Sequence, residues 1–321
     1  MKMNILFYVE TSNKLNVKNS GGIESLNKDL YKSIKKINKK TFISNKFTKK
    51  LGNKKWDIVV SSNNAKIFDN LHSKRKILWF HNKLQIEKAI RKSQLFPIIK
   101  NKINAVFNSK YLKNKTSKLY NFNQKIVIPN FLVEDFQNLK INYNRKPYFV
   151  WSVQRPKGLI NVIELWINKI NSKNNKVKLF IFGLQESKLE KYNLKKLSKF
   201  NIYFMGRVNK STLIKYYTKS MGMICLGYDE TFCLNVIEAY SCGLPIISFG
   251  LTAVGEMTNK NNSFLISGFK DLDSTIFKIL NLHKKKKEKY DKLLHKLFKK
   301  ILFTKYFSHM DKDFRSIVLL I

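Results

Sequence analysis

Two glutamates, Glu230 and Glu238, form the pair of side chains in this sequence with the clearest capacity for chemistry. They lie in the stretch ETFCLNVIEAYSCGLP, which begins at Glu230. The spacing places Glu230 in a loop and Glu238 about two turns into the following helix, so both carboxylates can point toward one crevice. Ionised carboxylates only accept hydrogen bonds, and paired hydroxyls of a sugar or ribose are natural donors. The alternative, a solvated or ion-paired Glu238, fits poorly with its apolar sequence neighbours.

The same stretch predicts an anion-binding helix terminus. A helix that begins near Phe232, with Cys233 and Leu234 in its first turn, would present free backbone N–H groups at the carboxyl end of a sheet. We expect these groups to bind phosphate. Gly243 suits the C-terminal cap of this helix, and Pro245 opens the next strand.

A basic turn is the second candidate anion site. The sequence Arg155-Pro156-Lys157-Gly158 comes directly after the expected strand 148–152 and opens the next helix. Cations at a strand-to-helix turn, beside free backbone donors, would stabilise a diphosphate without a metal ion. Taken alone, the turn fits a solvated basic loop equally well.

Two features of the first half of the chain are less specific. Gly21-Gly22 follows the first expected strand and opens a helix, and glycines there let the backbone approach a ligand closely. His81 follows the expected strand 77–80, so it lies at the carboxyl end of a strand. A simple turn explains the glycines as well as binding does, and a buried structural role explains His81 as well as a ligand contact does.

The elements that must position these residues alternate between strands and helices. Short runs rich in Ile, Val and Phe, each followed by a polar segment with helical spacing, indicate parallel sheets with crossover helices. The expected strands are 4–9, 57–61, 77–80, 105–108 and 125–128, and then 148–152, 177–182, 202–205, 222–226, 245–248 and 263–266. We therefore expect an α/β protein with two doubly wound domains, 1–145 and 146–321, joined by the polar stretch 138–147.

The C-terminal part of the chain has helical periodicity throughout. Beyond residue 271 the apolar residues recur at helical spacing, and those of 293–302 line one face of a lysine-rich segment. The last helix is expected to belong to the second domain, and it could pack back on the first.

Composition favours a reduced, cytoplasmic protein. A chain of 321 residues with 44% hydrophobic content can form two cores of ordinary size. Its longest apolar runs fall short of the roughly 18 to 20 residues that cross a bilayer. Glu10 ends the N-terminal apolar run before a signal-peptide core could form. Three cysteines without paired spacing support neither a disulfide framework nor a zinc site.

The net charge of +41, from 62 basic and 21 acidic residues, favours polyanionic partners. Over-use of lysine throughout the chain explains the bulk of this charge equally well, so only local clusters carry weight. One cluster lies at the end of the first expected helix, whose buried stripe should hold Leu26, Leu30, Ile34 and Ile37. Its members are Lys32, Lys35, Lys36, Lys39 and Lys40. This face predicts reversible, peripheral docking on the anionic inner face of a membrane, with a solvated helix end as the alternative.

These motifs, in this order, resemble the pattern of the retaining glycosyltransferase family 4 (glycosyl transferases group 1). The resemblance rests on the stretch 230–243 and on Lys157-Gly158, Gly21-Gly22, Phe107-Asn108-Ser109, Ile128-Pro129-Asn130 and Gly255-Glu256. It covers nearly the whole chain, and the spaced glutamates with the downstream Gly-x-Pro are its most specific part. It implies the GT-B fold, in which a cleft separates two Rossmann-like domains. The second domain would hold a nucleotide-sugar donor and the first domain the acceptor.

The resemblance also implies roles for individual residues of the second domain. Glu230 would contact the donor sugar, and Glu238 would bind the ribose diol. Lys157 and Arg155 would bind the diphosphate. Two departures from the family pattern weaken these assignments: Arg155 lies only two residues before Lys157, closer than the family's usual arginine, and Cys233 stands where glycine is common.

For the first domain, the resemblance implies that Gly22 lies near the phosphates and that His81 contacts the transferred sugar. The implied activity is metal-independent transfer of a hexose to a hydroxyl of a glycan or lipid-linked precursor, with retention at the anomeric carbon, as in polysaccharide biosynthesis. No cofactor is expected beyond the nucleoside-diphosphate sugar, which is a co-substrate. A front-face mechanism, in which the leaving phosphate oxygen takes the acceptor proton, is also implied.

Three alternatives remain at the level of sequence. The sequence from Asp271 to Asp273 is an Asp-x-Asp, the metal-binding signature of a different glycosyltransferase architecture, but it precedes an apolar helical run and indicates a helix cap. A nucleotide-sugar epimerase or hydrolase would share the donor site. A basic nucleic-acid-binding protein would use the net charge, although no known RNA- or DNA-binding motif is present.

Overall fold

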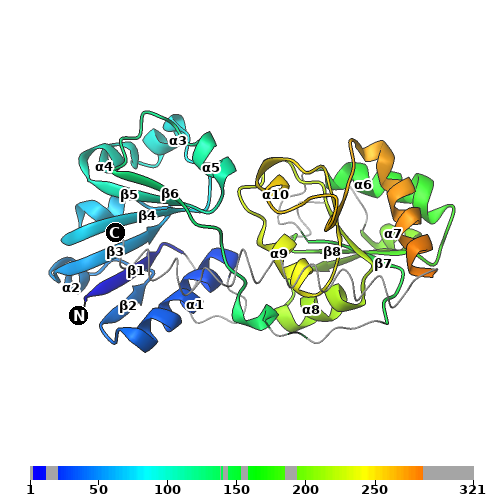
Figure 1. Cartoon of the computed structure of the whole chain (residues 1–321), viewed down its shortest axis with the longest axis horizontal. Coiled ribbons are helices and arrows are strands. Elements are labelled where there is room, and N and C mark those ends of the chain that lie inside the picture. The colour runs from blue at the N-terminus through cyan, green and yellow to red at the C-terminus, as the bar shows by residue number, and fades with distance from the viewer. Residues whose placement is uncertain are drawn as a thin grey trace. The chain divides into compact units, whose positions relative to one another are not determined.

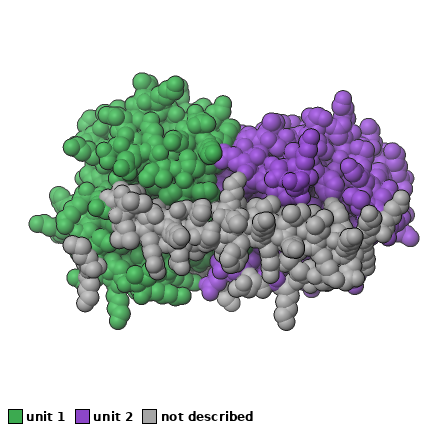
Figure 2. Space-filling view, in the orientation of Figure 1, with its two compact units in different colours: residues 1–133, 309–321 green, residues 134–308 purple. Residues whose placement is uncertain are grey.

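The computed structural model describes residues 3–11, 21–137, 139, 144–152, 158–184 and 194–284. The described residues form two compact units, unit 1 up to Val133 and unit 2 from Glu134 onward (Figure 2). Each unit contains one six-stranded sheet whose neighbouring strands all run parallel. Parallel sheets need helices on both faces, so the expected α/β class is confirmed. The domain boundary near residue 145 stays a prediction.

The sheet of unit 1 has the strand order β2-β1-β3-β4-β5-β6. Its strands are β1 (Ile5–Val9), β2 (Thr41–Ser44), β3 (Trp56–Ser62), β4 (Ser73–Phe80), β5 (Ile103–Phe107) and β6 (Gln124–Val127). The chain adds β2 on one side of β1 and then β3 on the other side. This reversal is the topological switch point, where open α/β sheets bind ligands at the carboxyl ends of their strands.

Helices cover both faces of this sheet. They are α1 (Gly22–Ile37), α2 (Lys49–Gly52), η1 (Lys66–Asp69), α3 (Ile86–Arg91), α4 (Leu95–Lys100) and α5 (Lys110–Lys115). Because parallel crossovers are right-handed, α1, which leads to the strand on one side, and α3 with α4, which lead to the other side, lie on opposite faces. Figure 1 shows this arrangement.

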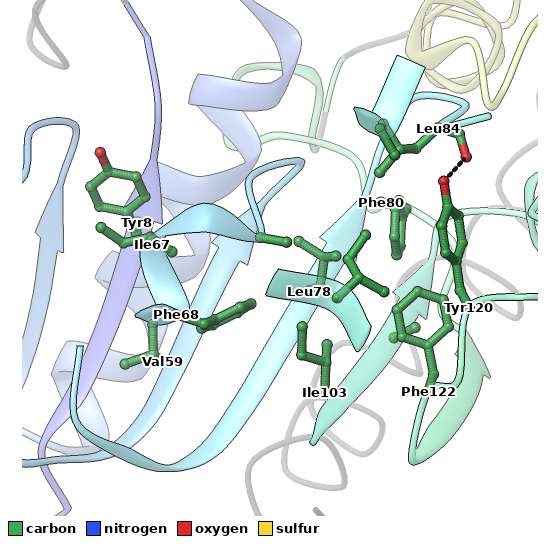
Figure 3. Packing of buried hydrophobic residues seen from close by; sticks show 14 of the residues in the cluster. Tyr8, Val59, Ile67, Phe68, Leu78, Phe80, Leu84, Ile103, Tyr120 and Phe122 are labelled. Carbon is green, nitrogen blue, oxygen red and sulfur yellow. Dashed lines mark hydrogen bonds between the residues drawn. The ribbon is translucent and has the colours of Figure 1, made fainter. Parts of the chain in front are cut away.

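One buried cluster of unit 1 lies between a face of its sheet and the helices that include α3 and α4, and Figure 3 shows part of it. Phe80 stacks on Phe107 with ring centroids 5.0 Å apart, and Phe122 packs edge-on against Phe80 at 5.6 Å. The hydroxyl of buried Tyr120 donates to the carbonyl oxygen of Leu84 at 3.0 Å. This bond ties the segment before β6 to the loop that follows β4.

The sheet of unit 2 has the order β12-β11-β10-β7-β8-β9. Its strands are β7 (Tyr148–Trp151), β8 (Lys178–Phe182), β9 (Ile202–Gly206), β10 (Gly222–Cys225), β11 (Ile246–Ser248) and β12 (Ser263–Leu265). The chain builds outward from β7 to β9 and then returns to place β10 on the other side of β7. The switch point of this sheet therefore lies between β7 and β10.

The helical elements of unit 2 surround this sheet. They are η2 (Glu134–Phe136), α6 (Leu159–Leu165), the π-helix η3 (Trp166–Asn171), α7 (Leu194–Leu197), η5 (Ser198–Phe200), α8 (Lys210–Lys219), α9 (Leu234–Ser241), α10 (Thr252–Gly255) and η6 (Phe269–Asp271). Residues 272–284 are also helical. The apolar stretch 293–302, and with it the expected packing of a last helix on the first domain, lies outside the described residues.

All the expected strands are present, and the sequence missed one, β2. It has only four residues between lysine-rich segments and lies at the sheet edge. One expected core residue is also wrong. Leu26, Leu30 and Ile34 are buried as expected, but Ile37 is the last residue of α1 and is 74% exposed. The helix ends before Ile37 can reach the sheet.

Candidate functional site

The candidate donor site lies at the carboxyl ends of β7 and β10, the switch point of unit 2. The loop after β7 leads to α6, and the loop after β10 leads through Glu230 to α9. Both loops leave the sheet at the edge where open α/β folds bind ligands. The topology therefore directs the two sequence motifs, the basic turn and the glutamate stretch, to the same edge.

Helix α9 begins at Leu234, two residues later than the sequence predicts. Cys233 is its N-cap residue, in a left-handed conformation with φ of 67°, and its side chain makes no capping hydrogen bond. The first N–H groups of a helix have no partner within the helix. Phe232 is buried beside this terminus. Its burial anchors the loop. The N–H of Val236 donates to the carbonyl oxygen of Cys233 at 3.0 Å, so Leu234 and Asn235 carry the N–H groups that the helix itself leaves for an anion.

The loop that carries Glu230 is held in a costly conformation. Asp229 and Cys233, on either side of it in sequence, both have positive φ angles, 68° and 67°. This conformation costs roughly 1 to 2 kcal/mol at Cys233 and less at Asp229, because aspartate adopts it more readily than most residues. The N–H of Ala253 donates to the carbonyl oxygen of Glu230 at 3.2 Å. The start of α10 thus fixes the backbone at Glu230, whose side chain is half-buried.

Glu238 lies in the second turn of α9, and its side chain is almost fully buried, with 8% exposed. Burial raises its pKa from 4.5 to about 7, with nearby Lys210 lowering the pKa and Asp135 raising it. A buried carboxylate needs hydrogen-bond donors when it ionises. The hydroxyls of a ribose are donors of this kind.

Gly158 joins the two loops of the site. It precedes α6 with φ of 82°, and a Cβ atom added there would lie 2.9 Å from the carbonyl oxygen of Leu226 in the loop after β10. Only glycine fits this contact, both for its φ and for the close approach. Arg155 and Lys157, the expected diphosphate ligands just before it in sequence, lie outside the described residues.

The opposite end of α9 is closed by its own backbone and by a buried arginine. The N–H groups of Gly243 and Leu244 donate to the carbonyl oxygens of Tyr240 and Ala239, both at 2.9 Å, which is a Schellman motif. Gly243 has φ of 68°, as this motif requires. The guanidinium of Arg145 donates to the carbonyl oxygens of Ser220, Cys242 and Gly243.

Sequence reasoning did not find Arg145, nor did it find an aromatic cluster at the carboxyl edge of the sheet, where the candidate donor site lies. Tyr228, Phe249 and Phe269 follow β10, β11 and β12, and their ring centroids lie 5.2 to 6.4 Å apart. Tyr228 is 49% exposed. No spacing in the sequence links three aromatic residues on separate loops. The only available signal was their shared position, each just after a strand.

In unit 1, the expected residues also lie at strand ends. Gly22 is the first residue of α1, which follows β1 at the switch point. His81 directly follows β4 and is buried, with its ring 4.5 Å from that of Trp79. The backbone N–H of His81 donates to the side-chain oxygen of Asn63 at 2.8 Å. Burial lowers the pKa of His81 to about 3, so the imidazole is neutral near pH 7.

Asp271 has the geometry of a cap, as its position predicts. Its carboxylate accepts hydrogen bonds from the N–H groups of Ser267 and Gly268, both at 3.1 Å, and from the Ser267 hydroxyl at 3.0 Å. These bonds lower the pKa of Asp271. The described residues contain no group of three or more His, Cys, Asp or Glu side chains that could hold a metal ion. Among them, no helix has both the length and the apolar character needed to cross a bilayer.

Two Rossmann-like units, each with a parallel sheet and a reversal of strand order, define the GT-B class of fold. The family model of glycosyl transferases group 1 matches residues 134–296, about half of the chain. The chain belongs to this family. No curated protein matches it closely enough to add a relative.

Solved structures share the fold across the chain. WaaG, a glycosyltransferase involved in lipopolysaccharide biosynthesis, superposes with a TM-score of 0.71 at 12% identity, over 98% of this chain and 99% of WaaG. HepE of Anabaena, in complex with UDP and glucose, gives a TM-score of 0.69 at 12% identity, over 99% and 100%.

The S. aureus protein TarM is a longer relative. A TarM mutant in complex with Fondaparinux, alpha-GlcNAc-glycerol and UDP gives a TM-score of 0.60 at 15% identity, over 78% of this chain and 52% of TarM. The present chain therefore spans about half the length of that protein. At identities this low, all three likenesses establish the GT-B fold alone.

Proposed function

We propose that the protein transfers a sugar from a nucleoside-diphosphate donor to a hydroxyl of a glycan or glycolipid precursor, with retention at the anomeric carbon. The observation that carries this proposal is the position of Glu230 and Glu238 on either side of the N-terminus of α9, at the switch point of unit 2. A phosphate bound at the N-terminus of α9 would lie between Glu230, proposed to bind the sugar, and Glu238, proposed to bind the ribose. A family 4 mechanism fits this arrangement.

The leaving nucleoside diphosphate carries the charge that the site must stabilise. The N–H groups of Leu234 and Asn235 in the first turn of α9, together with Lys157 and Arg155, are the donors proposed for it. Because these groups supply positive charge, we expect no divalent metal and no cofactor. Turnover should therefore survive EDTA, and loss of activity in EDTA with recovery in manganese would contradict this assignment.

Unit 1 is proposed to supply the acceptor side. A neutral His81 of the same unit can donate from one ring nitrogen and accept at the other, which suits a hydroxyl of the transferred sugar better than a phosphate. Gly22, at the start of α1, would leave room for the backbone to approach the phosphates. UDP-sugars are the first donors to test, because HepE and TarM were both solved with UDP.

The experiment is a nucleotide-release assay with a panel of nucleotide sugars, run with and without glycan and lipid-linked acceptors. The proposal predicts that nucleotide is released only when an acceptor is present. It also predicts that the anomeric configuration of the product, measured by NMR, is the same as that of the donor sugar. Release without any acceptor would indicate a hydrolase, and conversion of the donor sugar without release would indicate an epimerase. An inverted product would contradict retention.

A further inference from the structure

We infer that the outer face of the helix pair α3–α4 docks on an anionic lipid bilayer. Three large apolar side chains are exposed on these two short helices: Ile90 is 60% exposed, Phe96 67% and Ile99 56%. No described part of the chain covers them. Large apolar side chains on neighbouring elements mark an interaction surface more strongly than isolated ones do.

The two helices are amphipathic in a way that separates these residues from the core. Ala89 of α3 and Ile98 of α4 are fully buried in the core of unit 1, while the residues next to them in sequence, Ile90 and Ile99, point away from it. Phe96 lies three residues before Ile99, on the same side of α4. The exposed apolar residues of α3 and α4 therefore form a surface of their own and are not partly exposed members of the core.

The charge around this apolar face is of one sign. From His81 to Asn130 the sequence contains eleven Lys and Arg residues and a single acidic residue, Glu87. Arg91, Lys92 and Lys100 are exposed on the same helix pair. The ammonium of Lys100 lies 5.7 Å from the centre of the Phe96 ring. Apolar and cationic groups are thus intermingled, not segregated to separate faces.

This combination matches a bilayer surface better than other polyanions. Cations are attracted to anionic headgroups, and aliphatic and aromatic side chains enter the boundary between headgroups and acyl chains. A nucleic acid would use the cations and could stack a base on Phe96, but it offers nothing to Ile90 and Ile99. The aliphatic pair therefore favours lipid.

The lysine cluster of α1 is the competing docking surface, because its five lysines are all exposed. It has one exposed apolar side chain, Ile37, against three on α3–α4. The two surfaces lie on opposite faces of the sheet of unit 1, so a flat bilayer contacts only one of them at a time (Figure 1). Charge alone does not distinguish the two docking surfaces, whereas the larger number of exposed apolar side chains favours α3–α4.

Docking through α3–α4 would also serve the proposed reaction with a lipid-linked acceptor. His81, at the end of β4, precedes α3 by five residues, so the residue proposed to contact the transferred sugar and the docked face belong to one connection between strands. This link rests on the proposed function. Docking itself does not, because vesicle binding is measured without any donor or turnover.

The first experiment is co-sedimentation with vesicles of phosphatidylcholine, alone or with about 30% phosphatidylglycerol, at low and high salt. The apolar variant replaces Ile90, Phe96 and Ile99 with serine, and its matched control replaces three exposed apolar residues elsewhere, Ile37, Phe47 and Ile160. We expect the apolar variant to bind anionic vesicles about tenfold more weakly than the wild type, and the control to bind like the wild type. Thermal melts verify that each variant is folded.

A second pair of variants tests the charges. Arg91→Gln with Lys92→Gln and Lys100→Gln should weaken binding. By contrast, Lys35→Gln with Lys36→Gln and Lys39→Gln, at the end of α1 and just after it, should leave most of the binding intact. Equal binding by the apolar variant and the wild type would assign the attraction to charge alone and overturn the proposal. Loss of binding only in the α1 variant would move the docking face to α1. No binding to any vesicle would exclude a bilayer and point to a protein partner.

A third measurement does not depend on removing any side chain from the contact. All four native tryptophans are buried, so Phe96→Trp introduces the one exposed indole. On anionic vesicles its emission should shift to the blue and be quenched by lipids with brominated acyl chains, while Phe47→Trp should show neither change. An unquenched tryptophan at 96 on bound protein would contradict insertion of this face.

Discussion

The buried guanidinium of Arg145 donates a hydrogen bond to the carbonyl oxygen of Gly243 at 2.9 Å, across 98 positions of sequence. The same side chain donates to Cys242 at 3.1 Å and to Ser220 at 2.6 Å. A cation at the C-terminal end of α9 also complements the helix dipole. Arg145 thus holds one end of the helix whose other end is the candidate phosphate site.

Arg145→Met should lower the free energy of unfolding by about 3 kcal/mol, because it leaves buried carbonyl groups without donors. Arg145→Lys should recover only part of this loss, since one ammonium cannot reproduce the fork of the guanidinium. Urea denaturation measures both. The matched control is Arg207→Met at an exposed arginine, which should cost well under 1 kcal/mol. Equal losses at the two positions would refute the role assigned to Arg145.

The buried carboxyl of Glu238 makes stability depend on pH. Its folded pKa of about 7 is above the ordinary value of 4.5 for a glutamate, so between these values the folded state holds a proton that the unfolded state loses. Stability should therefore fall as pH rises through this window. Glu238→Gln should remove the fall and be more stable than the wild type above pH 7, by on the order of 3 kcal/mol.

Urea denaturation at several pH values between 5 and 8 checks this prediction for Glu238. Glu164→Gln, at an exposed glutamate of α6, is the control and should follow the wild-type curve. Parallel curves for the wild type and Glu238→Gln would show that the carboxyl is not held in the state inferred from its burial.

At Cys233, substitution by glycine should destabilise the protein less than substitution by alanine, which is the reverse of the usual order. The φ of 67° at this position strains any residue with a Cβ atom, so Cys233→Gly should be more stable than Cys233→Ala by about 1 kcal/mol. At Cys242, where φ is −84°, alanine should be the better replacement. Thermal or urea denaturation of the four variants decides the order, and alanine above glycine at position 233 would mean that the backbone there relaxes.

Much of the fold was predictable because buried parallel strands are continuous apolar runs of Ile, Val and Phe, which stand out against polar helices. Strand β2 was missed because it has only two apolar residues, Phe42 and Ile43, between lysine-rich segments. Ile37 was misplaced because periodicity continues to the last residue of a helix, whereas contact with the sheet does not. Periodicity shows which face of a helix a residue is on, but it does not show how far along the helix the sheet extends.

For the candidate site, the sequence located Glu230 and Glu238 because they belong to one short stretch. The partners of that stretch could not be predicted, since they come from distant segments. Arg145 bonds to backbone carbonyl groups at the C-terminal end of α9. Every residue has such a group, so the residue types there do not indicate that an arginine binds them. The start of α9 shifted by two residues because Cys233 takes a left-handed conformation that sequence patterns assign to glycine.

The most direct test of the donor site is calorimetric titration of UDP and UDP-sugars into the wild type, Glu230→Ala and Glu238→Ala. The wild type should bind UDP and at least one UDP-sugar. Glu238→Ala should weaken both, because the ribose is common to them, and Glu230→Ala should weaken the UDP-sugar while leaving UDP nearly unchanged. Equal loss of UDP binding in the two variants, or unchanged binding in both, would contradict the roles proposed for the two glutamates.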